Sequence, residues 1–432
     1  MTGFKPRVHW VSPLPPAQTD IAHYTARILP ELAESCDLVL WTDAPNWDKS
    51  LESYCEIRHL DPDHVQPRDF AMAGSGQGSD TVFVQIGNSW SFHAGLLRLI
   101  HRIPSVVVLH DLAVQELCVD AIRNRQFPRV FYEQEMARWH GAYGADCAVE
   151  VLKGRRSAFE LSCDIPGFEI TLDRAISVLV HTPTAYDAIT ATGALPAYLL
   201  DLPFRPGTMR PPADRARQGP LKFVQFGYIG LNRRLLEVLE ALAPLRNDVD
   251  FRFDIMGKVW DPHQVLKRIH ELGLEDRVTI HGFVAEPELD ARLAEAHLVF
   301  NLRYPTMGEA SGSQLRIWNA SAASVVTDLG WYGTLDNDTV FKIPLEGEAD
   351  ALRKLVRRLN ADRTLGTRIG AAGRARLEAR HAPARYARAI THVALQAPRD
   401  AHDAVLARQS RHVLARSVAV KPLQLQRLAA RI

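Results

Sequence analysis

The sequence predicts an α/β protein with two consecutive doubly wound domains, each a parallel sheet covered by helices on both faces. At 432 residues the chain is too long for one ordinary hydrophobic core. Short β-branched runs alternate with helical patterns, as parallel sheets require. The alternation stops in a Pro-, Gly- and Arg-rich stretch near the middle of the chain and then starts again, which indicates an interdomain linker.

The strands of both domains show the hydrophobic pattern of buried parallel sheets. The runs around Val84 and Val107 are apolar at consecutive positions, as expected when helices cover both faces. The expected strands are 7–12, 38–42, 81–86, 105–109 and 177–181 in the first domain, and 222–226, 251–256, 278–281, 298–302 and 324–327 in the second. The helical patterns of the second domain cover 231–245, 265–272, 288–295 and 346–359.

Composition and charge narrow the function classes. The chain carries 51 basic and 50 acidic residues, a near balance that argues against a dedicated nucleic-acid binder. Its five cysteines include no Cys-x-x-Cys pair, which disfavours a disulfide framework or a zinc site. The sequence shows no signal-peptide pattern, and no apolar run approaches the ~20 residues that cross a bilayer. We therefore expect a cytoplasmic protein with no nucleic-acid partner.

The first chemical motif is a glycine-containing turn between the expected strand 222–226 and the following helix. Its residues include Gly227, Gly230, Asn232, Arg233 and Arg234. Glycines let the backbone approach an anion, a helix start adds free N–H groups, and arginines can pair with phosphate. The alternative is an ordinary turn with two solvated arginines. The chain has neither a Gly-x-Gly-x-x-Gly turn nor a Walker motif, which disfavours dehydrogenases and ATPases.

The second motif runs from Gly308 to Ser313, between the expected strand 298–302 and a helix expected over 313–322. Here a carboxylate, Glu309, stands beside small residues at a helix start. Glu309 offers acceptors to sugar hydroxyls, and the backbone N–H groups of the following small residues can meet a diphosphate. The alternative is a plain helix start that Ser311 or Ser313 caps.

The third motif is His110-Asp111, directly after the apolar strand 105–109. Ligands of parallel α/β sheets bind beyond the carboxyl ends of the strands, so this polar pair is a site candidate. Asn88 follows the strand 81–86 in the same way, although it could simply form a turn. A structural histidine is the alternative for His110. No further His/Asp cluster has metal-ligand spacing, so no metal site is expected.

The order and spacing of these motifs resemble family-4 retaining glycosyltransferases of GT-B fold, including bacterial polysaccharide enzymes, over residues 7–395. The segments that carry the resemblance are 12–16, 85–89 with His93, 108–111, 226–234, 308–313 and 325–328. The resemblance implies two Rossmann-like domains that face each other across a cleft. By the same resemblance, the N-terminal domain would bind the acceptor and the C-terminal domain the nucleotide.

The resemblance also implies roles for individual residues. The expected catalytic residues are Glu309 at the donor sugar, His110 near the transferred sugar and Arg233 at the phosphates. The expected donor-binding residues are Gly227, Gly230, Asn232, Arg234, Lys258, Gly308, Ser311, Gly312 and Ser313. The expected acceptor-binding residues are Thr19, Asp20, His23, Asn88 and Asp111.

The implied reaction moves a sugar from a nucleotide-diphosphate sugar to a hydroxyl of a glycan or lipid-linked acceptor, with retention of configuration. The leaving diphosphate would depart first and help to deprotonate the incoming hydroxyl. Arg233, Arg234 and the helix-end N–H groups would stabilise its charge, so no cofactor or metal is expected. Two alternatives belong to other classes. One is a catalytically silent GT-B-like binding or scaffold protein, and the other is a nucleotide-sugar epimerase.

Three positions differ from the family pattern. Ile317 stands where a second glutamate would contact the ribose, and Tyr228 stands where a basic phosphate ligand is usual. Asp20 replaces a glycine near the anionic donor, where its charge could repel phosphate. These differences favour the silent alternative and leave the donor open.

The expected boundaries are an acceptor domain over 1–205, a linker over 206–220, a nucleotide domain over 221–382, a crossover helix over 383–397 and a basic extension over 398–432. In one interpretation this extension lies on an anionic membrane, at its inner face. In the other it forms an extra helix that packs on the protein or at a dimer contact. The sequence does not determine the oligomeric state.

Overall fold

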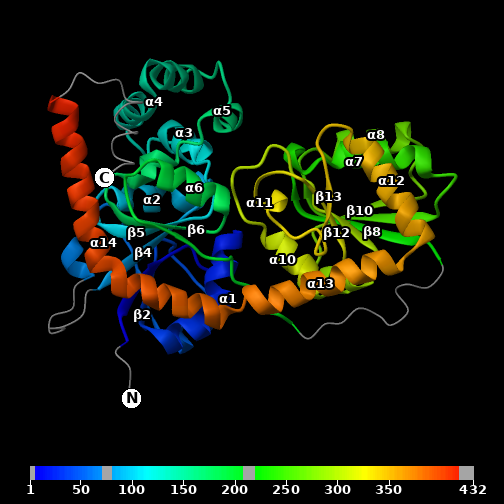
Figure 1. Cartoon of the computed structure of the whole chain (residues 1–432), viewed down its shortest axis with the longest axis horizontal. Helices are drawn as coiled ribbons and strands as arrows, with labels where there is room; N and C mark the ends of the chain where they lie inside the picture. The colour runs from blue at the N-terminus through cyan, green and yellow to red at the C-terminus, as the bar shows by residue number, and fades with distance from the viewer. Residues whose placement is uncertain (1–4, 71–79, 208–218, 418–432) are drawn as a thin grey trace. The chain divides into compact units, whose positions relative to one another are not determined.

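The computed structural model describes residues 5–70, 80–207 and 219–417, which form two compact α/β units (Figure 1). Unit 1 consists of the described parts of Met1–Pro203, Met307–Ala310 and Pro383–Ile432. Unit 2 consists of the described parts of Phe204–Thr306 and Ser311–Ala382. Most of the predicted linker, residues 208–218, lies outside the described residues.

Unit 1 contains a seven-stranded parallel sheet in the order β3-β2-β1-β4-β5-β6-β7. Its strands are β1 (Arg7–Val11), β2 (Asp37–Thr42), β3 (Glu56–His59), β4 (Thr81–Ile86), β5 (Ser105–Leu109), β6 (Ala175–Val180) and β7 (Ala197–Leu199). The five strands expected from the sequence are all present. The edge strands β3 and β7 were not expected, because they are short and only partly buried and so lack an apolar run.

Helices cover both faces of this sheet. They are α1 (Asp20–Ser35), α2 (Trp90–Ile100), α3 (Gln115–Arg123), α4 (Arg129–Leu152), α5 (Ala158–Asp164), α6 (Pro183–Ala191) and α14 (Pro383–Ser417), with the 3-10 helices η1 (Lys49–Ser53), η2 (Pro67–Asp69) and η3 (Phe168–Leu172). In β5, Val107 packs into the core under α2, α3 and α4, whereas Val106 and Val108 pack into the core under α1 and α14. The continuous apolar run therefore serves two cores.

Unit 2 contains a six-stranded parallel sheet in the order β10-β9-β8-β11-β12-β13. Its strands are β8 (Leu221–Ile229), β9 (Phe251–Val259), β10 (Val278–Gly282), β11 (Leu298–Phe300), β12 (Ser324–Thr327) and β13 (Phe341–Ile343). The five expected strands are present again, and the edge strand β13 was not expected. The helices are α7 (Leu235–Leu242), α8 (Pro262–Glu271), α9 (Glu286–Glu295), α10 (Gly312–Asn319), α11 (Gly330–Gly333), α12 (Glu348–Ala361) and α13 (Thr364–Arg380), with η4 (Leu231–Arg233) and η5 (Ala243–Leu245).

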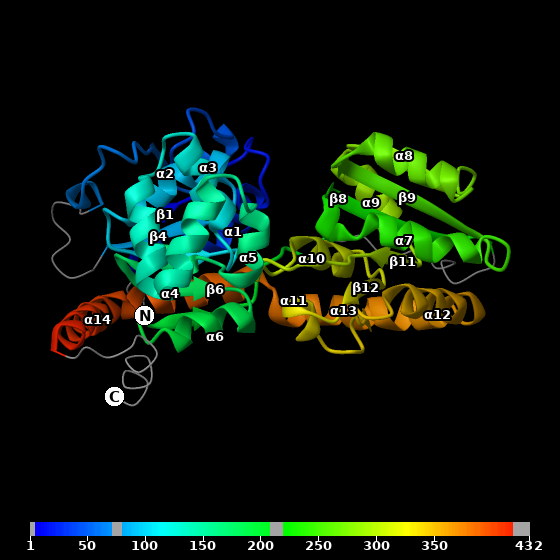
Figure 2. The same cartoon turned by 90° about the horizontal axis from the view of Figure 1, so that it is seen from above.

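Strands β8 and β9 run side by side for three residues beyond the predicted ends (Figure 2). Gly227 and Gly257 lie opposite each other where this extra length begins. A Cβ atom at Gly257 would lie 2.1 Å from the Gly227 carbonyl oxygen, and both residues have positive φ. Only glycine permits this close approach, so the pair lets both strands continue to the edge where ligands of such sheets bind.

Helix α14 corrects the predicted end of the crossover helix at residue 397. The helix continues through Pro398 to Ser417 and lies along unit 1, next to α1 and β6 (Figure 1). Asp400 and Ala404 are buried and Arg408 reaches the Ala175 carbonyl oxygen, a four-residue spacing that turns one helix face toward the sheet. This favours the packed-helix interpretation for residues 398–409.

The basic residues after residue 417, which suggested membrane contact, lie outside the described residues, and of residues 410–417 only the backbone is described. Within residues 5–70, 80–207 and 219–417, no helix combines the length and hydrophobicity needed to span a bilayer.

The Tyr198→Phe substitution tests the packing of the extension. The Tyr198 hydroxyl donates to Asp400 Oδ2 over 2.7 Å, and hydrogen bonds to carboxylates stabilise folded proteins measurably. We expect the substitution to lower the free energy of unfolding by about 1 kcal/mol. Urea unfolding measures this change, with the exposed Tyr54→Phe as matched control. An equal effect of both substitutions would show that the contact contributes nothing.

Candidate active site

The carboxyl ends of β4, β5 and β6 bring the predicted site residues of unit 1 together. Gly87 follows β4, and a Cβ atom there would lie 2.6 Å from Ile21 Cδ1 and 3.1 Å from His93 Nε2. The turn therefore packs against the first turn of α1. Because parallel strands end at one edge, His110 after β5 lies at the same edge.

His110 is a neutral, well-packed imidazole. Its Nε2 atom lies 2.9 Å from Gln85 Oε1, and its ring meets Tyr24 edge-on at 4.9 Å between centroids. Burial lowers the pKa of His110 well below its ordinary value, and His181 and His93 lower it further. At neutral pH this ring can therefore donate or accept a hydrogen bond, but it carries no positive charge.

His181 is a candidate site residue that the sequence analysis missed. It directly follows β6, its ring centroid lies 5.1 Å from that of His110, and its Nδ1 atom donates to the Leu200 carbonyl oxygen over 2.9 Å. The signal was present, because a polar residue after a buried strand is the same pattern that selected His110. Two histidines from neighbouring strands thus lie together at this edge.

Asp111 and Asn88 are joined by a hydrogen bond at the same edge. The Asn88 backbone N–H donates to Asp111 Oδ2 over 2.9 Å. The Asn88 side chain donates to Glu116 Oε2 at 2.8 Å and accepts from the Leu117 N–H at 3.1 Å. Both ends of the amide therefore hold the start of α3.

The three acceptor candidates of α1 occupy its first turn. Thr19 caps the helix, because its hydroxyl oxygen accepts from the Ile21 N–H at 3.4 Å. Asp20 and His23 are exposed. Since Ile21 contacts the Gly87 turn, these polar groups lie at the same edge as His110.

The segment Met307–Ala310 groups with unit 1, although it was predicted to lie in the nucleotide domain. The Met307 carbonyl accepts from the Ala113 N–H at 3.0 Å, and the Gly308 carbonyl accepts from the Thr182 hydroxyl at 2.9 Å. Glu309 Oε2 accepts from the Met307 N–H at 2.7 Å. The segment that contains Glu309 thus contacts residues that closely follow His110 and His181.

In unit 2, protein groups already hold both arginines of the glycine turn. Arg233 is buried and donates to the Phe226 carbonyl oxygen over 3.0 Å. Arg234 donates from Nη2 to Glu348 Oε2 over 2.6 Å and also pairs with Glu237. Its backbone has the left-handed φ of 59°, which is unfavourable for a non-glycine residue. Both guanidinium groups are therefore fixed, and phosphate would have to compete for them.

The helix start that the sequence predicts after Glu309 is present at α10, and it is capped as the alternative interpretation expects. Ser311 is the cap, because its hydroxyl oxygen accepts from the Gln314 N–H at 3.1 Å. A helix leaves its first N–H groups without partners inside the helix, and these belong to Gly312 and Ser313. A Cβ atom at Gly312 would meet nothing within 4 Å, so the surface beside it is open. Ile317 is fully buried in the core under α10, so it offers no contact to a ribose.

Exposed aromatic rings lie at the carboxyl ends of the strands of unit 2. Phe283, directly after β10, is 90% exposed, and Tyr228 near the end of β8 is 65% exposed. Lys258 lies exposed between them, near the end of β9 and opposite Tyr228 in register. Phe283 was missed by the sequence analysis, although an aromatic residue after a strand is the available signal. These rings offer flat surfaces on which a planar ligand can stack.

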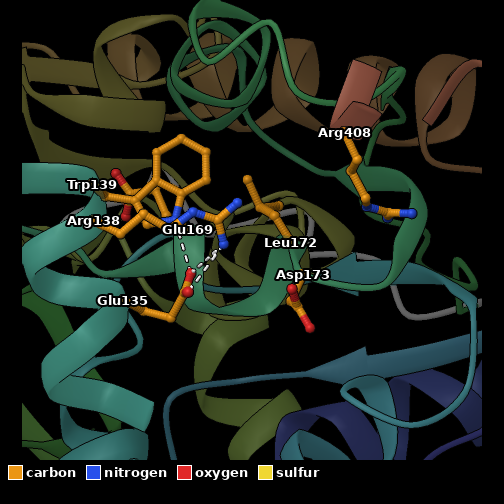
Figure 3. Close-up of a pocket in the computed structure, with 7 residues that line it drawn as sticks. All are labelled: Glu135, Arg138, Trp139, Glu169, Leu172, Asp173 and Arg408. Atoms are coloured by element: carbon orange, nitrogen blue, oxygen red, sulfur yellow. Dashed lines mark hydrogen bonds and ion pairs between the residues drawn. The ribbon is translucent and has the colours of Figure 1, made fainter. Parts of the chain in front are cut away.

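A separate small hollow of unit 1 lies between α4, η3 and α14 (Figure 3). Its volume is about 30 Å³, which suits water rather than a sugar. Glu135 at its wall accepts hydrogen bonds from Arg138 and from Trp139 Nε1, so these polar groups of the lining are bonded to one another. Within the described ranges, no three His, Cys, Asp or Glu side chains gather as a metal-binding group.

Comparison with protein families gives one match in the C-terminal part of the chain. Residues 233–392 match a family described as glycosyl transferase-like. The matched region includes Arg233, Glu309 and the first turn of α10. A comparison with curated proteins finds no significant match.

Comparison with solved structures identifies the fold of the chain. Sucrose-phosphate synthase from Thermosynechococcus elongatus matches with a TM-score of 0.61 at 16% identity, over 91% of this chain and 99% of that chain. HepE from Anabaena in complex with UDP matches with a TM-score of 0.57 at 14% identity, over 90% and 99%. The complex of HepE with UDP-glucose matches at 0.56 and 12% identity, over 90% and 98%. These matches confirm the GT-B fold, and with the family match over residues 233–392 they confirm the resemblance to GT-B glycosyltransferases.

The buried histidine under the Gly87 turn predicts a pH dependence of stability. Burial lowers the pKa of His93 to about 4, whereas an unfolded histidine titrates near 6.5. Between these values the unfolded chain binds the proton and the folded chain does not, so stability falls as the pH falls from 6.5 toward 4. We expect His93→Gln, which keeps a donor toward the Gln85 carbonyl, to reduce this slope by about 1 kcal/mol per pH unit.

Urea unfolding of the wild type and of His93→Gln at pH 6.5, 5.5 and 4.5 measures the two slopes. His9, whose pKa burial also lowers to about 4, contributes the same dependence in both proteins and so cancels. Parallel slopes would contradict the assignment of this dependence to His93.

Proposed function

We propose that this chain is a glycosyltransferase that moves a sugar from a nucleotide-diphosphate sugar to a hydroxyl of a glycan or lipid-linked acceptor. The observation that carries the proposal is the position of Glu309. Its segment leads into α10 of the family-matched region, yet it contacts unit 1 beside His110 and His181. A carboxylate and two histidines thereby lie at one edge of unit 1, and the carboxylate stands three residues before the first residue of α10 in the chain.

The proposed donor is a UDP-sugar. HepE, which shares the fold, was solved with UDP and with UDP-glucose. The diphosphate would bind the N–H groups at the start of α10, where a helix N-terminus favours negative charge. The uracil would stack on an exposed ring of unit 2, for which Phe283 is the most accessible residue.

The proposed reaction is a displacement on one face of the sugar. The bond between the sugar C1 atom and the diphosphate oxygen breaks, and the acceptor oxygen bonds to C1 on the same face. The acceptor proton passes to the departing phosphate oxygen. Because the acceptor bonds to C1 on the face that the diphosphate leaves, the configuration is retained without a protein nucleophile. The helix N–H groups would stabilise the leaving charge without a divalent metal. Glu309 would hold sugar hydroxyls, and neutral His110 would hydrogen-bond near the reacting carbon.

A catalytically silent sugar-nucleotide binding protein is the second candidate. Three observations favour it. Ile317 is buried where a ribose contact is usual, Tyr228 offers no positive charge, and the two turn arginines are bound by protein groups. Catalysis separates this candidate from the transferase, since both would bind the nucleotide.

Substitution of Glu309 tests the transferase. We expect Glu309→Ala to lower the rate of sugar transfer and the rate of donor hydrolysis at least about 100-fold each, because the sugar loses its positioning carboxylate. Glu150→Ala, at an exposed carboxylate of α4, is the matched control and should keep full activity. Product analysis by mass spectrometry and NMR measures transfer and anomeric configuration. A wild type that binds but never transfers or hydrolyses any donor would identify the silent alternative. Conversion of the free donor to an epimer without acceptor would identify an epimerase.

Substitution of Phe283 tests the nucleotide site. We expect Phe283→Leu to weaken UDP binding about 10-fold, since one stacked base contributes roughly 1–3 kcal/mol. Phe283→Tyr keeps the ring and should bind UDP as the wild type does. Isothermal titration calorimetry measures both affinities, after a thermal-shift screen of nucleoside diphosphates identifies the base. Equal affinities of the Leu and Tyr variants would place the base elsewhere.

A further inference from the structure

The hydroxyl group of Thr182 serves two elements at once. Thr182 follows His181 and is 1% exposed. Its Oγ1 atom accepts from the Ala185 N–H at 3.2 Å, which caps α6, and donates to the Gly308 carbonyl oxygen over 2.9 Å. A hydroxyl has one proton and two lone pairs, so both bonds form without competing. The single proton is committed to Gly308.

A second contact holds the same segment. The carbonyl of Met307 accepts from the Ala113 N–H at 3.0 Å, so two consecutive carbonyls of the segment are bonded to unit 1. Gly308 has a left-handed φ of 78°, and a Cβ atom there would lie 2.5 Å from Leu112 Cβ. The backbone is therefore pressed closely against the chain that follows His110, and a larger residue could not lie there.

The carboxylate of Glu309 depends on this anchored backbone. Its Oε2 atom accepts from the Met307 N–H at 2.7 Å, so the side chain folds back on the segment that carries it. A shift of Met307 and Gly308 would move the carboxylate with them. The position of Glu309 at the edge that holds His110 and His181 is thus set by the bonds of Thr182 and Ala113.

We propose that Thr182 is a positioning residue for Glu309, which it holds in place through the Gly308 carbonyl. The inference rests on the proposed function, because Glu309 is the sugar-binding carboxylate of that proposal. Thr182 itself contacts neither donor nor acceptor. Its loss should therefore slow the reaction of the sugar without weakening the binding of the nucleotide.

Helix capping alone is the competing explanation for Thr182. Three substitutions separate it from positioning. Thr182→Val keeps the shape and loses both bonds, whereas Thr182→Ser keeps both. Ser157→Ala removes the comparable cap of α5, in which the Ser157 hydroxyl oxygen accepts from the Glu160 N–H at 3.1 Å. It leaves the Gly308 bond in place, so it measures the cost of a lost cap in the same unit.

Kinetics and binding give the first readout. We expect Thr182→Val to lower kcat for transfer and donor hydrolysis about 10- to 100-fold, since small displacements of a positioning group cost this much. The Kd for UDP should stay unchanged, because UDP lacks the sugar. Thr182→Ser should restore kcat. Ser157→Ala should lower Tm as Thr182→Val does but keep kcat.

Hydrogen–deuterium exchange gives a readout that does not depend on activity. In Thr182→Val the amides of Ala113 and of Met307–Ala310 should exchange at least several-fold faster than in Ser157→Ala, because the anchored segment loosens. Unchanged protection would overturn the inference whether or not the chain is a transferase. Faster exchange in Thr182→Val, together with a wild type that transfers no sugar, would instead keep the anchor and overturn the proposed function. Equal kcat in Thr182→Val and Ser157→Ala would reduce Thr182 to a helix cap.

Discussion

Each sheet is parallel and its central strands are buried on both faces, and this constraint determines where the candidates that directly follow a strand lie. A parallel strand can reach its neighbour only through a crossover, so all strands of a unit end at one edge. At that edge the backbone leaves the core, and polar or small residues replace the apolar run. Gly87, His110 and His181 follow three neighbouring strands of unit 1 for this reason. The polar candidate residues of unit 1 therefore lie directly after the apolar strands.

The charges of unit 2 are arranged around the cost of burying them. A buried guanidinium needs partners, because an uncompensated charge inside a protein is strongly unfavourable. Arg233 has the Phe226 carbonyl, and Arg234 has the carboxylate of Glu348. These bonds fix the turn, and a diphosphate would have to compete with the Phe226 carbonyl for Arg233 and with carboxylates for Arg234. The helix start at Gly312 has open space beside it, and the proposed function therefore places most of the leaving-group stabilisation there.

Glu309 illustrates how residues that are close in sequence can belong to different units. It stands three residues before α10, yet its segment makes its backbone hydrogen bonds with Ala113 and Thr182 of unit 1. The local pattern of small and acidic residues predicts a functional helix start. It contains no information about bonding partners that lie more than a hundred residues away.

The sequence alone determined ten of the strands, the residue types at their carboxyl ends and the helix start after Glu309, because periodicity and turn chemistry are local. It missed β3, β7 and β13, since edge strands are only partly buried and need no continuous apolar run. Only the tertiary structure decided that α14 continues to Ser417, that the arginines of the turn are bonded within the protein, and that Thr182 holds Gly308. These features depend on contacts between segments that are distant in sequence, and the packing within each unit sets the geometry of those contacts.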